Sequence, residues 1–588
     1  MTTTVPATVT QAAPGGSGEI DPITTEIIRS GLNAAADEMN ATLIRSAYTP
    51  VIYEMKDCSV GLLDDRHQIL GQSAGLPIFL GNLEVVTELT ELEIGREGWR
   101  EGDVWILNDA YLAGTHLHDM TVYGPVFLGE DLVGFATCRA HWLDVGGKDA
   151  GSPTDSTNIF QEGLRLGPTK VVSGGQVIDY VVDVLTRNGR FPYPARGDLF
   201  AQIACVRTGQ ERLARLVARY GLETVRRARD QFFAQTERIE RAAVASIPDG
   251  RYTAEGSIDD DGVVAGVERM VRVAVEIEGD RMTIDLSGTD DMAAGPINCG
   301  APQAVSAARV AYKLLVNPDR PVDGGAFRPL EVKVRPGSLL AAEEPAPCEW
   351  YFTPLGLLID LVAKALSPVM PDRVAAASYG DSMVIGIGGT DPRTGGPYLV
   401  YEPTVGGWGA WQGGDGQDAL INNVNGSLKD VPIEVAETKY PVYVRRYSIR
   451  RDSGGAGRWR GGNGVEREYL LEADGTMMLW FERSKTPGWG LFGGHDARPP
   501  EVVVNEGRPG ERRMLKVNGL SLKRGDTVTC RTGGGGGFGD PSLRSREAVE
   551  ADLADGAVSP EAARELYGYA PVHAASGESA SSRTGGNR

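Results

Sequence analysis

Several motifs that would define a common enzyme class are missing from this chain of 588 residues. It contains no Gly-x4-Gly-Lys-Ser/Thr phosphate loop and no Gly-x-Ser-x-Gly nucleophile motif, so neither nucleotide binding nor serine hydrolase chemistry is indicated. The six cysteines are widely separated and form no Cys-x-x-Cys pair, which favours reduced thiols over a disulfide framework or a cysteine-based metal site. No apolar run approaches the roughly 20 residues that are needed to cross a bilayer.

Positive charge is also scarce: the chain has 59 basic and 79 acidic residues, which give a formal net charge of −20. Nucleic acids and anionic membranes both require a basic face, so neither is an expected partner. The first residues, 1–20, are rich in Thr, Pro, Ala and Gly and lack a basic-then-apolar signal pattern, which predicts a disordered leader. We expect a cytoplasmic protein.

Glycine, in contrast, is abundant: the chain has 77, nearly twice the usual share of about 7%. The glycines follow no collagen period, so we expect many tight turns in a strand-rich protein. Three glycine-rich segments, Asp144–Gly147, Gly386–Thr390 and Gly533–Gly537, are likewise interpreted as turns, since none stands between a clear strand and a helix as a phosphate-binding loop does.

Hydrophobic periodicity predicts a mixed α+β fold. A helix is expected from Ile23 to about Ser46, introduced by Asp21-Pro22, and residues 197–244 are strongly helical. Residues 251–286 alternate apolar and polar side chains, as in an antiparallel meander. Shorter helices are expected at 83–93, 301–315 and 357–366 and as a closing pair within 547–567, and strands at 59–63, 68–72, 103–107, 120–128, 132–139, 442–446, 465–471, 477–481, 501–504 and 527–531.

A chain of this length exceeds one hydrophobic core, so we expect two to four structural units. The N-terminal half is predicted to be an α/β unit that carries the functional site, and the C-terminal half to be rich in strands and glycine. The predicted boundaries are 1–20 for the leader, 21–245 for the N-terminal unit, 246–380 for a mixed middle unit, 381–568 for the β-rich unit and 569–588 for a disordered tail.

The clearest chemical signal is a concentration of histidine. Three of the six histidines, His116, His118 and His141, fall within 26 residues and lie beside the carboxylates Asp109, Asp119 and Asp144. Imidazole and carboxylate together suit a borderline or hard divalent ion such as Zn, Mn or Fe. The alternative is that each histidine is a polar core residue whose ring nitrogens form hydrogen bonds with backbone groups. Three histidines beside three carboxylates favour a metal site instead.

The local conformation decides which of these side chains converge. In an extended chain His116 and His118 share a face and Asp119 points away, whereas in a turn His116 and Asp119 converge. Gly114 and Thr115 favour the turn, and His141 follows a strand-like run that can bring it to the same point. An open metal shell would polarise a substrate oxygen, while a closed shell would be structural.

Ordered motifs along nearly the whole chain, from Asp21-Pro22 to about Tyr567, resemble the B-type subunit of hydantoinases, 5-oxoprolinases and acetone carboxylases. The matching segments include Tyr53-Glu-Met-Lys-Asp-Cys-Ser, Asn108-Asp-x-Tyr-x-x-Gly-Thr-His-Leu-x-Asp, Ile159-Phe-Gln-Glu-Gly-Leu, Asp285-Leu-Ser-Gly-Thr, Gly295-Pro-Ile-Asn, Gly406-Gly-Trp-Gly-Ala, Asp452-Ser-Gly-Gly-Ala-Gly and the Thr532-Gly-Gly-Gly-Gly run.

The resemblance implies one divalent metal ion held by His116, Asp119 and His141, with Asp57 as the fourth ligand. At position 118, where relatives commonly carry proline, this chain has His118. We expect His118 and Asp144 to assist proton transfer, and Asp109 and Asp144 to hold imidazole N–H groups.

The resemblance also implies a division of labour, in which a separate actin-like A-type subunit uses ATP and the two subunits form a heterotetramer or a larger assembly. The expected activity is ATP-dependent hydrolysis of a hydantoin, 5-oxoproline or related lactam whose carbonyl the partner has phosphorylated. The alternatives are a subunit of an ATP-dependent ketone carboxylase, whose relatives tend to be longer, and a non-catalytic scaffold.

Overall fold

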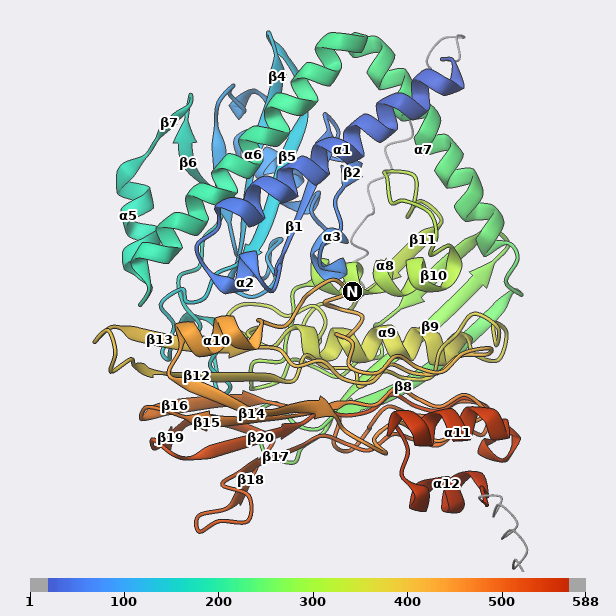
Figure 1. The fold of residues 1–588 in the computed structure, drawn as a ribbon. Coiled ribbons are helices and arrows are strands. Elements are labelled where there is room, and N and C mark those ends of the chain that lie inside the picture. Colours follow the sequence, from blue (N-terminus) through green and yellow to red (C-terminus); the bar gives the residue numbers. More distant parts are fainter. Residues whose placement is uncertain (1–19, 571–588) are drawn as a thin grey trace, which may run out of the picture.

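The computed structural model describes residues 20–570 and shows a mixed α+β protein with three regions (Figure 1). The N-terminal region contains a seven-stranded sheet covered by long helices. The middle region contains a four-stranded sheet with two helices, and the C-terminal region contains two further sheets. The predicted leader and tail fall almost wholly on residues 1–19 and 571–588, which lie outside the described residues.

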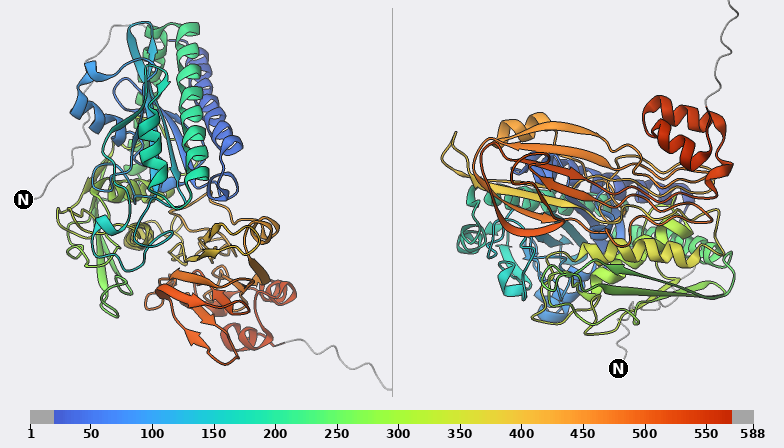
Figure 2. Two further views of the ribbon diagram at one scale, coloured as in Figure 1. Left: turned by 90° about the vertical axis from the view of Figure 1, so that its left-hand side faces the viewer. Right: turned by 90° about the horizontal axis from the view of Figure 1, so that it is seen from below.

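The N-terminal sheet has the order β2-β1-β5-β4-β3-β6-β7, and all its pairings are antiparallel. Helices α1 and α6 lie on one face of it (Figure 2), where α1 contacts β1 and β2 and α6 contacts β4 and β5. The strands are β1 (Cys58–Asp64), β2 (Ile69–Gln72), β3 (Val104–Leu107), β4 (Asp119–Leu128), β5 (Asp131–His141), β6 (Thr169–Ser173) and β7 (Gln176–Val177). The helices of this region are α1 (Pro22–Ser46), α2 (Pro50–Tyr53), α3 (Pro77–Leu80), α4 (Val85–Ile94), α5 (Asp179–Arg187), α6 (Pro192–Tyr220) and α7 (Leu222–Val244).

Two local features explain where the long helices begin and end. The Asp21 side chain accepts a hydrogen bond from Thr24 N at 3.1 Å and so caps α1, as the Asp-Pro pair predicts. The helical stretch 197–244 is divided between α6 and α7 at Gly221, whose φ of 83° ends the first helix. Helix α7 then runs from the N-terminal region to the middle region, where it contacts α8 and β10.

The middle region consists of a sheet of order β11-β10-β9-β8 and two helices that pack together, of which α9 lies against β8 and β9. Strands β8 to β10 form the predicted antiparallel meander, and β11 adds a parallel pairing with β10 that the sequence did not indicate. The elements are β8 (Gly250–Ile258), β9 (Arg269–Glu278), β10 (Arg281–Asp285), α8 (Ala301–Val316), β11 (Leu330–Lys333) and α9 (Phe352–Leu366).

In the C-terminal region the sheets β13-β12-β16-β19 and β14-β15-β20-β17-β18 share one hydrophobic core. The predicted strands lie in β14, β15, β16, β17 and β20, and α11 and α12 are the predicted closing pair. The elements are β12 (Val384–Thr390), β13 (Pro397–Glu402), α10 (Ile433–Lys439), β14 (Val442–Ile449), β15 (Val465–Leu471), β16 (Gly475–Trp480), β17 (Glu501–Val504), β18 (Arg512–Arg513), β19 (Lys516–Leu522), β20 (Thr527–Arg531), α11 (Arg546–Asp555) and α12 (Pro560–Tyr567).

The interpretation of the C-terminal glycine runs as turns is wrong. Gly386–Thr390 belongs to β12, and Gly533–Gly537 is an extended segment packed among other glycine-rich segments. Gly535 N donates to Gly462 O, while a Cβ on Gly535 would lie 2.0 Å from Trp408 O. Glycine is therefore required here because neighbouring backbones approach each other closely, rather than because the chain turns.

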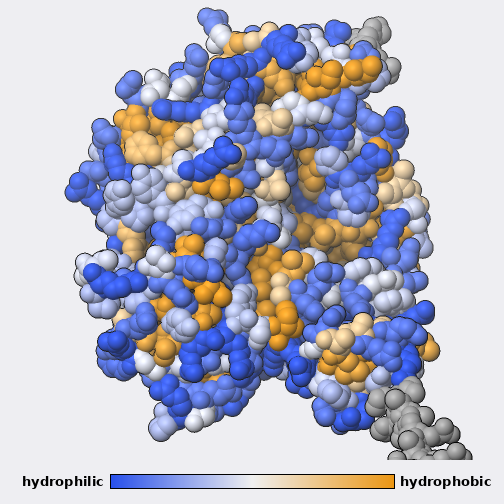
Figure 3. Space-filling view, viewed as in Figure 1, coloured by the Kyte–Doolittle hydropathy of each residue, from blue (hydrophilic) through white to orange (hydrophobic). Residues whose placement is uncertain are grey.

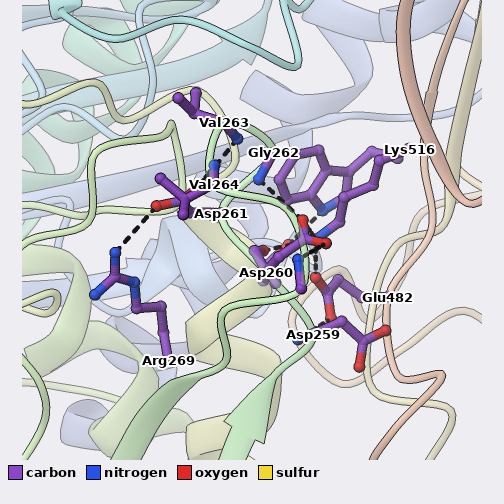
Figure 4. A network of polar contacts seen from close by, with 12 residues as sticks. Asp259, Asp260, Asp261, Gly262, Val263, Val264, Arg269, Glu482 and Lys516 are labelled. Carbon is purple, nitrogen blue, oxygen red and sulfur yellow. Dashed lines mark hydrogen bonds and ion pairs between the residues drawn. The ribbon is translucent and has the colours of Figure 1, made fainter.

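An acidic loop fixes the middle region to the C-terminal region (Figure 4). In this loop, after β8, Asp259 N donates to Glu482 Oε2 at 3.0 Å and Asp260 Oδ1 lies 3.2 Å from Lys516 Nζ. Lys516 also pairs with Glu482, so one largely buried cation holds carboxylates from both regions together. These donors and acceptors are paired with one another inside the protein, which is typical of a structural contact.

Two further predictions concern the chain as a whole. All six cysteines are free and buried, as expected for reduced thiols. Within residues 20–570 no helix has both the length and the apolar character of a membrane span. The predicted domain boundaries stay predictions, and the largest hydrophobic cluster joins the middle region to residues such as Val384, Trp480 and Phe538 of the C-terminal region.

Candidate metal centre

The antiparallel register of the N-terminal sheet brings the two halves of the histidine motif together. Asp119 is the first residue of β4 and His141 the last residue of β5, and they are direct partners across the two strands. Cys58, the first residue of β1, pairs with Ala140 on the other side of β5. His141 N accordingly donates to Asp57 O at 3.1 Å.

His116 reaches the same point from the loop between β3 and β4. The loop folds back on itself because the Asn108 side chain donates to Leu117 O at 2.6 Å and to Leu164 O at 2.8 Å. Asp119 N also donates to His116 O at 3.2 Å, which is the turn that Gly114 and Thr115 suggested. This turn brings the side chains of His116 and Asp119 together, as expected.

The three side chains form a compact triangle. His116 Nε2 lies 3.0 Å from Asp119 Oδ1 and 3.1 Å from His141 Nδ1, and His141 Nδ1 lies 3.1 Å from Asp119 Oδ1. All three residues are buried, with at most 3% of their surface exposed. Separations near 3 Å between two imidazole nitrogens and a carboxylate oxygen suit ligands of a single divalent cation with bonds of about 2 Å.

Several neighbours orient this triangle. Thr115 Oγ1 donates to Asp119 Oδ2, and Tyr351 OH donates to the same oxygen at 3.2 Å, so that Oδ1 is directed to the imidazoles. On the far side of the His116 ring, Nδ1 lies 2.9 Å from Glu349 O and 3.1 Å from Glu349 Oε1. A group that binds Nδ1 in this way fixes the ring orientation and leaves Nε2 facing the triangle.

The electrostatics show a buried excess of negative charge. Burial acts against the charged form of His116, but Asp119 and Glu349 outweigh it and raise the His116 pKa well above its ordinary value. Burial raises the pKa of Asp57, and repulsion from Asp119 raises it further. Burial also lowers the pKa of His141 to about 4, which keeps this imidazole neutral near pH 7. Metal binding would therefore displace protons from His116 and Asp57, since neutral imidazole and ionised carboxylate are the forms that bind a metal.

Asp57 borders the same small cavity as the triangle, which has about 340 Å³ of empty space, including the portion open to solvent. Its Oδ1 is buried and has no hydrogen-bond partner among the described residues. The cavity combines polar groups with an apolar wall. It is lined by Asp57, Leu76, Phe79, His116, Asp119, His141, Tyr351, Phe352, Ser382, Val384, Tyr401, Pro403 and Asn425.

The other predicted residues lie elsewhere. His118 is completely buried, its Nδ1 lies 3.1 Å from Glu349 Oε1, and its ring stacks on His141 with centroids 5.3 Å apart. It is not among the residues that line the cavity. Its place between Glu349 and His141 suits a role in orienting the metal ligands.

The structure differs from the expectation that Asp109 and Asp144 hold imidazole N–H groups. Asp144 Oδ1 instead accepts from Arg190 Nη1 at 2.8 Å, and Arg190 N donates to its other oxygen. Asp109 accepts from Tyr111 N at 2.9 Å and faces Arg165. Closeness to a histidine in the sequence misled the prediction, because Arg190 and Arg165 engage these two carboxylates in the folded chain.

Sequence reasoning did not identify the groups contributed by the second half of the chain. Glu349 and Tyr351 precede α9, Tyr401 is in β13, and Ser382 and Asn425 are in loops. Tyr401 stacks on His141 with ring centroids 5.2 Å apart. The run Cys-Glu-Trp-Tyr-Phe at 348–352 is an unusual concentration of aromatic side chains around one carboxylate, and it was the available signal.

A larger groove lies away from this centre, with about 800 Å³ of empty space between α3 and α8. Figure 3 shows hydrophobic surface in a hollow on this face of the molecule. Its apolar lining includes Pro77, Leu80, Val310, Leu314, Val322 and Phe327. No member of the imidazole triangle lines it, so size alone does not identify the functional site.

Comparison with known proteins identifies relatives that match nearly the whole chain. The chain is 31% identical over 570 residues to the putative B-type subunit of a D-/L-hydantoinase from Pseudomonas sp., covering 94% of this chain and 95% of the relative. It is 33% identical to the caprolactamase beta subunit of Pseudomonas jessenii, covering 93% and 96%. The crystal structure of the ATP-dependent caprolactamase from Pseudomonas jessenii matches with a TM-score of 0.87 over 94% of this chain and 96% of that chain.

An acetone carboxylase structure also matches, with a TM-score of 0.85 over 93% of this chain and 79% of that chain. At 19% identity this likeness concerns the fold alone. The family model described as Hydantoinase B/oxoprolinase matches residues 21–541. With most of its length matched, including every residue of the imidazole triangle, the chain belongs to the Hydantoinase B/oxoprolinase family.

Proposed function

We propose that this protein is the metal-bearing subunit of an ATP-dependent cyclic amidase, which opens a hydantoin, 5-oxoproline or related lactam ring together with an ATP-binding partner. The convergence of His116, Asp119 and His141 within about 3 Å of one another is the observation that carries the proposal. The relatives named as a hydantoinase subunit and a caprolactamase subunit support the class of reaction.

The residues present fit one divalent cation. His116, Asp119 and His141 offer ligand atoms within 4.8 Å of one another, and Asp57 Oδ1 is a buried oxygen without a hydrogen-bond partner among the described residues. We propose these four as the ligands of Zn, Mn or Fe, since two imidazoles and two carboxylates suit each of these ions. A bound divalent cation would supply Lewis-acid polarisation of an oxygen atom in the cavity.

The residues around the cavity would bind the substrate ring and hold the metal ligands in position. An unstrained amide is a poor electrophile, and phosphorylation of its carbonyl oxygen by the partner subunit would supply a good leaving group. Leu76, Phe79 and Phe352 provide an apolar wall that holds the ring and limits access of bulk water. Tyr351 and Thr115 hold Asp119 in place, so the site is preorganised before substrate arrives.

The partner we propose is an actin-like ATP-binding A-type subunit, in a heterotetramer or a larger assembly. The relative named as a beta subunit supports an assembly with a second chain, and this sequence has no phosphate loop of its own. His118 lies behind the cavity rather than in it, so we assign it a positioning role in place of proton transfer. Asp144 is paired with Arg190 and is left out of the reaction.

Metal analysis and turnover test this function together. The purified protein is expected to contain about one divalent ion per chain, and the double variant His116→Ala, His141→Ala is expected to lose both the ion and ring opening in the assembled enzyme. A matched control is His495→Ala, because His495 lies outside the cavity. Unchanged turnover in the double variant would exclude the assigned site.

A further inference from the structure

Two polar side chains from the C-terminal region reach the metal cavity and have no place in the metal centre. Ser382 lies in the segment before β12, and Asn425 lies in the loop before α10. Both are buried, with 1% and 8% of their surface exposed. Asn425 Nδ2 donates to Ser382 Oγ at 2.9 Å, which makes them a pair.

The neighbouring Asn422 determines the polarity of this pair. Its Oδ1 accepts from Val424 N at 3.1 Å and Asn425 N at 3.0 Å, so its Nδ2 is the atom that faces Ser382 Oγ, at 3.2 Å. Ser382 Oγ thus accepts two amide hydrogens, and its own proton has no acceptor among the described residues. A hydroxyl group whose lone pairs are engaged in this way is a directed donor.

The backbone also holds Ser382 firmly. Gly380 and Met383 on either side have positive φ values of 70° and 46°, and Met383 N donates to Asp381 Oδ2 at 3.2 Å. Thr404 N donates to Ser382 O at 2.9 Å and ties the segment to the chain after β13. The hydroxyl is therefore mounted on a fixed turn rather than on a mobile loop.

We propose that Ser382 and Asn425 recognise the ring nitrogen of an uncharged cyclic amide in the cavity. The Ser382 hydroxyl donates to the nitrogen lone pair of the O-phosphorylated ring, and Asn425 Oδ1 accepts the N–H of the same ring before phosphorylation or after the nitrogen is protonated. An adjacent donor and acceptor match a ring nitrogen in both states, whereas a ring oxygen would leave the acceptor unpaired. This inference rests on the proposed function and assigns it a class of substrate.

The rest of the wall indicates which rings fit. Leu76, Phe79, Phe352 and Val384 offer hydrocarbon surface to the ring carbons. A carboxylate on the ring would be placed beside Asp57 and Asp119, and none of the described residues that line the cavity is a lysine or an arginine. The proposed divalent cation would compensate the phosphoryl group of the activated ring, so a ring carboxylate would be a second anion without a counter-charge of its own, and the geometry favours a plain lactam over 5-oxoproline.

The test of the substrate class uses the complete enzyme with its ATP-binding partner. ε-Caprolactam and 2-pyrrolidinone are compared with 5-oxoproline, which carries a carboxylate on the same five-membered ring as 2-pyrrolidinone. We expect kcat/KM for 2-pyrrolidinone to exceed that for 5-oxoproline by tenfold or more. An equal or greater value for 5-oxoproline would overturn the inference, while failure to open any cyclic amide would overturn the proposed function instead.

The test of the residues measures ring opening against ATP consumption. In Ser382→Ala, ring opening is expected to fall by about ten- to hundredfold, which corresponds to one lost hydrogen bond in a buried site, while the partner still consumes ATP. The ratio of ADP formed to ring opened therefore rises, and the metal content stays near one per chain. Ser378→Ala is the control, because Ser378 contacts Asp360 and does not line the cavity.

A second variant keeps the result decisive if the alanine variant is unstable. In Asn425→Asp the new carboxylate accepts the Ser382 proton and removes the donor from the ring nitrogen, so the same rise in ADP per ring opened is expected. Ser382→Thr keeps the hydroxyl group and is expected to keep most of the coupling. An unchanged ratio in both Ser382→Ala and Asn425→Asp, or loss of the metal in either, would contradict the assignment.

Discussion

At the scale of single residues, the most consequential contact of the metal centre is the one between Glu349 and His116. Glu349 Oε1 lies 3.1 Å from Nδ1 of both His116 and His118, and neither of its carboxylate oxygens has a regular hydrogen bond among the described residues. A carboxylate behind a metal-binding imidazole fixes the ring and raises its basicity. Glu349 is therefore expected to control metal affinity without touching the substrate cavity.

Replacing this charge tests that role. Glu349→Gln is expected to weaken metal affinity by about ten- to a hundredfold, the usual effect of losing such a partner. Competition with a fluorescent chelator measures the affinity directly. Glu343→Gln, at an exposed position six residues away, is the control and should bind metal as the wild type does. Equal affinities in the two variants would show that Glu349 only fills space.

The residue scale also shows what the sequence can predict about the site. His116, Asp119 and His141 were predicted as a group, because they lie close in the chain and a single hairpin, formed by β4 and β5, separates Asp119 from His141. Glu349 is 233 residues from His116, and no local pattern connects two positions that only the tertiary fold brings together. Asp144 is the opposite case: it lies close to His141 in the sequence, but in the structure it pairs with Arg190.

At the scale of elements, the packed glycine segments are the most demanding feature. Gly535→Ala would place a Cβ 2.0 Å from Trp408 O, and the obstacle is backbone, which cannot move aside as a flexible side chain would. We expect a loss of about 3 kcal/mol in the free energy of unfolding, at the upper end of the effect of overpacking. Urea unfolding measures this loss.

Gly167→Ala is the matched control, because a Cβ there meets no atom within 4 Å. It should change the free energy of unfolding by less than about 1 kcal/mol. If the two alanine variants were equally stable, the close approach of the glycine segments would not contribute to stability.

Helix α9 carries Asp360, a buried carboxyl group whose contribution to the free energy of unfolding changes with pH in a defined direction. Burial raises the pKa of the Asp360 carboxyl to about 6, and Arg483, 3.5 Å away, offsets this effect only in part. The folded protein thus keeps a proton that the unfolded chain releases near pH 4. The contribution of Asp360 to the free energy of unfolding therefore falls as pH rises from about 4 to about 6, by up to roughly 3 kcal/mol.

Asp360→Asn should remove this slope. Unfolding by urea at several pH values between 4 and 7 is expected to give a difference between variant and wild type that changes across the window and is constant above it. The exposed Asp372→Asn should leave the curve parallel to that of the wild type. Parallel curves for Asp360→Asn as well would contradict the assigned direction.

Comparison of the elements with their prediction shows where periodicity is sufficient. β15, β17 and β20 begin and end at the predicted residues, since β15 alternates buried apolar and charged side chains and the other two are short β-branched segments. The strands β12 and β19 were missed because glycine in one and polar side chains in the other hide the alternation. Glycine was taken as a sign of turns, but the fold also uses it where backbones meet.

At the scale of the whole molecule, the metal centre joins regions of the chain that fold in different sheets. Its proposed ligands lie at the start of β4, at the end of β5 and in the loops before β1 and β4, Glu349 and Tyr351 lie before α9, and Tyr401 belongs to β13 of the C-terminal region. The complete cavity around the ligands therefore forms only when all three regions are assembled. Sequence alone indicated only the site residues of the N-terminal region, since their contacts with the other two regions are long-range.

The assembled chain is expected to have no ATPase activity of its own. The sequence lacks a phosphate loop, and the C-terminal glycine-rich runs lie in a strand or among packed backbones rather than at the start of a helix. A coupled assay for ADP release tests this with the purified protein, and addition of the ATP-binding partner and a lactam should restore ADP release. Strong ATP hydrolysis by this chain alone would overturn the proposed division of labour.

Removing the metal should destabilise the junction between the three regions more than it destabilises any single sheet. Without a cation the carboxyl groups of Asp57, Asp119 and Glu349 remain buried near one another, and their repulsion is relieved by protonation of His116 and Asp57, whose pKa values are raised, or by opening. Hydrogen exchange after chelation is therefore expected to accelerate at the start of β4, at the end of β5 and around Tyr351 together. The sheet containing β14 and β15, which does not contribute to the cavity, serves as the internal reference and should exchange as before.

Acceleration confined to β4 and β5 would mean that the cation stabilises the N-terminal sheet alone. Residues 349–351 and 401 would then be neighbours of the centre without being held by it.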